Sequence, residues 1–179
     1  MKKYIILIAL LCSVVAFAER DYKTLQGLSW SIAFPIECRD LPGMGLSGNI
    51  GYDCAYPVND QFAMGFYLTV GGGFWGEFVK YSDYDHYHIT FRLNGGIMMQ
   101  IGDLTNKPYL LGVAPATGLG FYDMDLVLPI DVRFGKYITD RWYIMGELTY
   151  HISLADETAT IEPAIRVGYN FGKKIKEKR

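Results

Sequence analysis

The residues whose types and spacing come closest to those of a catalytic site are His151-Ile152-Ser153. A histidine and a serine two positions apart on a β-strand lie on the same face, because successive side chains alternate between the two faces. Glu157 and Glu162 follow, and an acid that orients the imidazole is the third member of such a nucleophilic site. His151, Ser153 and Glu162 are therefore the candidate residues for acyl transfer.

This pair resembles the His-x-Ser of the lipid A 3-O-deacylases, but two features weigh against that function. Leu154 stands where that family usually has Asn. Strand alternation also places both side chains on the polar face of their strand, whereas a site that cleaves a lipid has to meet acyl chains. We therefore favour the interpretation that His151 and Ser153 are polar lining residues and that the protein is not an enzyme. A lipid A-modifying hydrolase is the alternative.

A larger set of ionisable residues recurs along the chain on the same kind of face. Isolated charges are very costly to bury, so acids and bases that share an interior have to pair. We expect them to form a polar network in a lumen, with a gate or narrow polar path as the functional alternative to a plug. The expected members are Glu37, Asp53, Glu77, Arg92, Asp131, Arg133, Glu147, Glu162 and Arg166.

These side chains need strands to position them, and the last hairpin, residues 141–171, shows the strand pattern most clearly. Every second residue is apolar from Trp142 to Ile152 and again from Ile161 to Phe171. The residues between them include Glu147, His151 and Arg166. One apolar face and one charged face are typical of a strand between lipid and a polar lumen.

The same alternation recurs in six earlier segments, at about 28–37, 44–56, 61–79, 87–101, 109–122 and 126–137. With the last hairpin, this predicts an all-β fold: an eight-stranded antiparallel up-and-down transmembrane barrel with short periplasmic turns and a polar, plugged lumen. At every second connection a polar turn is followed by an aromatic residue and an apolar stretch. We expect an aromatic girdle at the periplasmic end, formed by Phe62, Tyr109, Trp142, Tyr169 and Phe171.

Alternation alone does not decide which face points inward. A soluble lipocalin-like barrel that binds a ligand would bury the apolar face. An eight-stranded interior has little room for such bulky side chains, and the other face, rich in Gly, Ala and Ser, would make a poor soluble surface. The lysines at Lys80, Lys107, Lys136 and 173–178 also lie at or beyond strand ends. We therefore expect the apolar face to meet lipid.

Residues 1–18 have the pattern of an export signal. Lys2 and Lys3 precede an apolar stretch that is too short to span a bilayer as a helix. Ala16-Phe17-Ala18 then forms a small-x-small cleavage site. We predict cleavage near Ala18, a barrel over 19–172 and a basic periplasmic tail over 173–179.

Charge and cysteine content bear on other classes of function. The chain has 17 Lys and Arg against 19 Asp and Glu; without Lys2 and Lys3, 15 bases face the same 19 acids, a formal charge of about −4. No basic patch indicates nucleic-acid binding, and no Cys/His spacing indicates a metal or cofactor. Cys38 and Cys54 remain after cleavage, and since we expect them near opposite ends of the barrel, we predict that they are unpaired.

Nearly the whole mature chain resembles the small outer-membrane barrels of the OmpA transmembrane-domain and OmpX type, in strand number, alternation, turn placement and a last strand ending in Tyr169-Asn170-Phe171. It departs from them in the segment 172–179, because such proteins often end at the aromatic residue. The resemblance implies the outer membrane of a Gram-negative-type bacterium. It also implies contact with outer-membrane lipid and lipopolysaccharide, and recognition of the last strand by the barrel assembly machinery.

In similar barrels, charge pairs plug the lumen. We therefore expect a structural, adhesion or weakly porin-like role in the envelope, without a large open pore. Four short loops face the outside, and the longest hairpin carries Tyr81-Ser82-Asp83-Tyr84-Asp85-His86 at its tip. Tyr and Asp suit a polar interface, so Tyr81 to His86 is the candidate contact for an extracellular partner.

Overall fold

The computed structural model describes residues 24–37, 43–77, 87–122, 125–154 and 159–172. Its strands are β1 (Leu25–Ala33), β2 (Ile36–Glu37), β3 (Gly43–Asn59), β4 (Phe62–Glu77), β5 (Tyr87–Ile101), β6 (Tyr109–Ala114), β7 (Leu119–Tyr122), β8 (Asp125–Tyr137), β9 (Trp142–Ser153) and β10 (Ala159–Asn170). No helix in these ranges is long and apolar enough to cross a membrane. The predicted export signal, Cys38, the Tyr81–His86 tip and the 173–179 tail lie outside the described residues.

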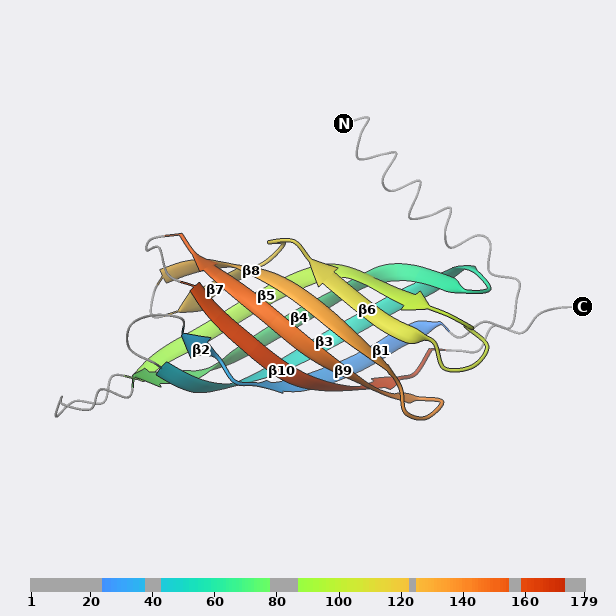
Figure 1. Ribbon diagram of the computed structural model, residues 1–179, viewed down its shortest axis with the longest axis horizontal. Coiled ribbons are helices and arrows are strands. Elements are labelled where there is room, and N and C mark those ends of the chain that lie inside the picture. The colour runs from blue at the N-terminus through green and yellow to red at the C-terminus, as the bar shows by residue number, and fades with distance from the viewer. Residues whose placement is uncertain (1–23, 38–42, 78–86, 123–124, 155–158, 173–179) are drawn as a thin grey trace, which may run out of the picture.

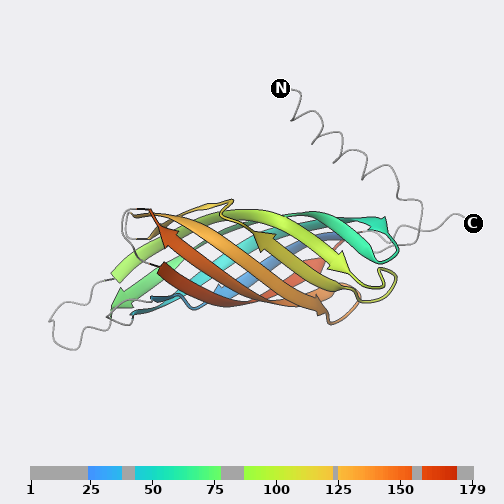
Figure 2. The ribbon, with the colours of Figure 1, turned by 45° about the horizontal axis from the view of Figure 1, so that its top comes forward.

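The strands form one closed antiparallel barrel (Figures 1 and 2). Neighbours along the chain pair, except that β1 and β2 both pair with β3 and that β6 and β7 both pair with β5 and β8. β1 also pairs with β10, from Gly27 opposite Asn170 to Ala33 opposite Ala164. This last ladder joins the two ends of the described chain and leaves no free sheet edge between them. Closure matters because unpaired backbone groups cannot be tolerated in lipid.

The ten segments make up eight strands, as predicted. β1 and β2 form one strand interrupted at residues 34–35, and both pair with β10 and β3 in an unchanged register. β6 and β7 form another, and both pair with β5 and β8. Five residues separate Val113 from Leu119, but only three separate their β5 partners Ile97 and Leu93. The interruption is therefore a two-residue bulge, which keeps the alternation in phase on both sides.

The apolar rows of the strands face outward. Large side chains such as Ile50, Leu68, Ile89 and Leu148 are exposed, and Ile89 is 79% exposed. The alternate residues point inward and are buried, including ionisable groups such as Arg133. The hypothesis of a soluble barrel needs the apolar set inside, so it is wrong.

Three short turns lie at the same end of the barrel as Thr24 and Gly172, where the described chain begins and ends (Figure 1). These turns are 59–62, 101–109 and 137–142, and we call this end the turn end. The turn at 101–109 folds back onto the first one, since the Leu104 amide donates to the Asp60 carbonyl at 3.1 Å. Within it, the Asp103 carboxylate accepts hydrogen bonds from the Thr105 hydroxyl (2.6 Å) and amide (2.9 Å), which lower the pKa of Asp103.

Candidate functional site

The half of the lumen near the turn end is filled mainly by apolar and aromatic side chains, with the buried amides of Gln100 and Asn170 bonded to the Tyr137 hydroxyl among them. Leu104, from a turn, is completely buried and closes this end. The Tyr137 and Tyr143 rings pack edge to face above it, with centroids 5.7 Å apart. This apolar layer comprises Leu25, Ala55, Ala63, Tyr67, Met98, Leu104, Leu110, Ala114, Tyr137, Tyr143 and Met145. These side chains pack together across the lumen at this end.

Glu147 of β9 is the centre of the charged layer beyond it. Its Oε2 accepts a hydrogen bond from Arg166 Nε at 2.8 Å and lies 2.8 Å from Arg166 Nη2 in an ion pair. Its Oε1 meets Arg133 Nη2 at 3.2 Å and Arg92 Nη2 at 3.3 Å. One buried carboxylate therefore holds three buried guanidinium groups together.

The strands position these groups from both sides of the lumen. Arg133 of β8 lies directly opposite Glu147 in the β8–β9 ladder, so this contact follows from local register. Arg166 comes from the adjacent strand β10. Arg92 comes from β5, which is not hydrogen-bonded to β9, so its contact crosses the lumen. The network therefore ties opposite walls of the barrel together.

Glu162 forms a second centre, with partners from three other strands. Its Oε1 meets Arg92 Nη1 at 3.3 Å and accepts the Ser47 hydroxyl at 2.9 Å. Its Oε2 lies 3.1 Å from His151 Nε2. Arg92 thus bridges Glu147 and Glu162, and joins the two centres into one network.

Asp131 and Asp53 complete the network on the side of the apolar layer. Asp131 Oδ2 meets Arg133 Nη2 at 2.7 Å and accepts the Tyr67 hydroxyl at 2.9 Å. The Arg133 guanidinium also lies over the Tyr67 ring, 3.7 Å from its centroid. Asp53 accepts the Tyr143 hydroxyl at 2.6 Å. Tyrosines of the apolar layer therefore point their hydroxyls at the charged layer and seal the boundary between them.

Seven of the nine residues predicted for the lumen network are brought together in this way. They are Asp53, Arg92, Asp131, Arg133, Glu147, Glu162 and Arg166. Glu37 and Glu77 lie on β2 and β4, and their side chains fall outside the described part of the structure. The prediction missed the tyrosines Tyr67 and Tyr143 as members, although alternation places both inward.

The alternative catalytic residues are placed as lumen residues. His151 is 1% exposed and is held by Glu162, which is itself bound to Arg92. Ser153 lies at the end of β9, opposite Val127 of β8. Their strand turns the same face inward as Glu147 does, so the outward apolar rows lie on the other side of the barrel wall.

The five residues predicted for the aromatic girdle all lie at the turn end, on the outward rows. Trp142 packs edge to face on Tyr169, with centroids 5.1 Å apart, and Tyr109 stacks on Phe134 at 5.9 Å. The Phe171 and Tyr52 ring centroids are 6.5 Å apart, and Phe62 is the first residue of β4.

Of the two cysteines expected in the mature chain, Cys54 is a free, buried thiol.

No family model matches the chain, and no curated protein sequence matches it. Solved barrels share its fold. Ail, the attachment invasion locus protein of Yersinia pestis, is 13% identical, with a TM-score of 0.51 over 83% of this chain and 99% of that one. The outer membrane enzyme PagL is 7% identical (TM-score 0.52; 79% and 99% covered). Neisserial surface protein A is 12% identical (TM-score 0.50; 82% and 97% covered).

Proposed function

We propose that this chain, which has the predicted fold of the small eight-stranded outer-membrane barrels, is an integral outer-membrane protein with a closed lumen and a structural or adhesion role. The outward apolar rows support membrane insertion. The export signal predicted over residues 1–18, with cleavage near Ala18, supports transport to that membrane. The turn end then faces the periplasm, and the loops at the other end face the outside.

The closed lumen is the observation that carries this proposal. Arg92, Glu147 and Arg166 join opposite walls at mid-lumen, and the side chains of all three are at most 4% exposed. Beyond them the packed apolar layer extends to Leu104 at the turn end. Ions would have to break a buried charge network and then cross an apolar layer, which is unfavourable at both steps. A closed lumen is compatible with a structural role in the membrane and with adhesion to a protein partner.

Conductance measurements in planar bilayers test the closed lumen. The native barrel should show no channel events above the protein-free bilayer. A Tyr137→Ala/Tyr143→Ala variant, which empties the apolar layer, should conduct more than the native protein if that layer closes the lumen. Steady conductance by the native barrel would instead support the weakly porin-like role and contradict this proposal.

The hydrolase alternative is tested separately through lipid A. His151 and Ser153 face the lumen, which acyl chains do not enter, so Ser153→Ala should leave the lipid A of cells that express the protein unchanged. Mass spectra of lipid A should be the same for the native chain, Ser153→Ala and a strain without the protein. A deacylated lipid A that appears only with the native chain would establish the enzyme.

A further inference from the structure

Lys136 is exceptional among the outward-facing residues. It belongs to the outward row of β8, two positions beyond Phe134, and it is exposed. Along the outward rows of the described strands, it is the one charged side chain. No carboxylate of the described residues forms an ion pair with it. Its ammonium group is therefore open to an anionic group from outside the chain.

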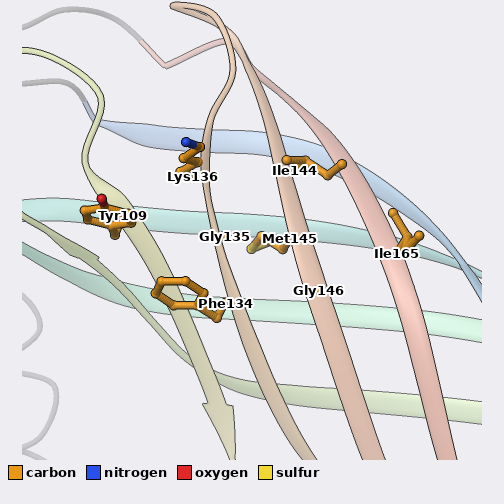
Figure 3. A pocket seen from close by; sticks show the side chains of 8 residues that line it. All are labelled: Tyr109, Phe134, Gly135, Lys136, Ile144, Met145, Gly146 and Ile165. Atoms are coloured by element: carbon orange, nitrogen blue, oxygen red, sulfur yellow. The ribbon is translucent and has the colours of Figure 1, made fainter.

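A groove in the barrel wall runs from Lys136 toward mid-barrel (Figure 3). Its volume is about 420 Å³, and Gly146 is one of the residues that line it. Gly146 faces outward, and a Cβ built there would have the Phe134 carbonyl oxygen as its nearest neighbour, at 3.9 Å. Phe134 and Ile165 lie directly opposite Gly146 in the two flanking strands. The missing side chain therefore leaves an apolar notch between them.

The end of the groove near the turn between β8 and β9 is polar. Lys136 lies there beside Tyr109, its direct partner in the β6–β8 ladder. Figure 3 shows the Lys136 nitrogen and the Tyr109 hydroxyl toward this end, with Phe134 and Gly146 farther from it. Lysine and tyrosine with apolar stems and polar tips are suited to the boundary between acyl chains and headgroups. The groove therefore has a cationic end at Lys136 and an apolar stretch beyond it.

We propose that this groove binds one anionic phospholipid of the periplasmic leaflet. An acyl chain lies over Gly146 between Phe134 and Ile165, and the phosphate contacts the Lys136 ammonium and the Tyr109 hydroxyl. This inference rests on the proposed function, because the leaflet follows from placing the turn end in the periplasm. The charge of Lys136 favours a headgroup with net negative charge over a zwitterionic one.

Native mass spectrometry of the folded barrel in a neutral detergent tests this site. The barrel is titrated with phosphatidylglycerol or with phosphatidylcholine of the same acyl chains. The native protein should retain one phosphatidylglycerol in preference to phosphatidylcholine. Lys136→Gln should weaken phosphatidylglycerol retention about fivefold, to the phosphatidylcholine level, whereas Lys136→Arg should keep the preference. Equal retention of the two lipids by the native barrel would overturn the headgroup assignment.

Gly146→Leu tests the groove itself, because it fills the notch without a backbone clash. It should weaken retention of both lipids, and Gly146→Ala should do so less. Gly48→Leu is the matched control: Gly48 also faces outward, and a Cβ there has nothing within 4 Å. Equal effects of the Gly146 and Gly48 substitutions would overturn the site. Preferential retention of lipopolysaccharide that depends on Lys136 would also overturn it, because that lipid belongs to the other leaflet.

Failure of this inference and failure of the proposed function give different results. Every variant is first checked for the heat-modifiable mobility of the folded barrel. A folded, non-conducting barrel without lipid preference contradicts only the groove. Conductance by the native barrel contradicts the proposed function and leaves the lipid titration unaffected.

Discussion

Glu147 is the residue on which the lumen network depends most. Replacing it by Gln removes the charge that three buried guanidinium groups share, while the side chain keeps its size. Loss of one partner of a buried ion pair costs about 3–5 kcal/mol, so Glu147→Gln should lower the urea midpoint of the barrel in lipid vesicles. Leu148→Val, on the neighbouring outward position, should change stability by only about 1 kcal/mol. Equal midpoints for the Glu147 variant and the native barrel would contradict the network.

Two glycines on neighbouring strands show at the same scale how tightly the lumen is packed. A Cβ at Gly168 would lie 2.0 Å from the Tyr143 ring, whereas a Cβ at Gly146 meets nothing closer than 3.9 Å. Gly168→Ala should therefore displace Tyr143 and destabilise the barrel by about 1–3 kcal/mol. Gly146→Ala makes the same chemical change on the lipid side and should be nearly neutral. Urea titrations of the two variants check this, and a Gly146 variant as unstable as the Gly168 variant would contradict it.

At the scale of elements, β10 is the strand that closes the barrel. It pairs with β1 on one side and β9 on the other, and Asn170 donates to the Thr24 carbonyl across the seam. Replacing Tyr169 and Phe171 together by Ser removes the girdle contacts at its end, so membrane assembly should fall sharply. Deleting residues 173–179 should have little effect, because β10 ends at Asn170. The measurement is the heat-modifiable folded band on cold SDS gels. A full folded band for the Ser variant, with loss of that band in the deletion, would refute both expectations.

At the scale of the whole molecule, the outward apolar surface determines where the protein can reside. A monomer that exposed such rows to water would aggregate, since soluble monomers rarely expose large contiguous apolar patches. The protein should therefore stay in the membrane pellet through high-salt and carbonate washes and come out only with detergent. Quantitative blots of pellet and supernatant measure this. Release into the carbonate supernatant would mean that the barrel does not span the membrane.

The order of residues along each strand assigns every side chain to one of two faces, because a strand has a period of two residues. That rule was enough to place Arg133, Glu147 and Arg166 in one lumen and Trp142 and Tyr169 on the opposite face. It was also enough to count eight strands, since an interruption that preserves alternation does not disturb the count. The same rule placed Tyr67 and Tyr143 inward, but their role as a seal depends on neighbours that the alternation does not specify.

The pairing of side chains across the lumen, in contrast, follows from the closed barrel. Arg92 and Glu147 are 55 residues apart, and they meet because barrel closure brings β5 and β9 to facing walls at one height. The bulge between Val113 and Leu119 could not be predicted either, because residues 109–122 alternate as one continuous strand. Its two extra residues are recognised only from the register of this strand with β5 and β8. Height within the lumen depends on strand stagger and tilt, which are properties of the closed sheet and are absent from any single strand. This is why the division of the lumen into an apolar layer and a charged layer emerged only with the fold.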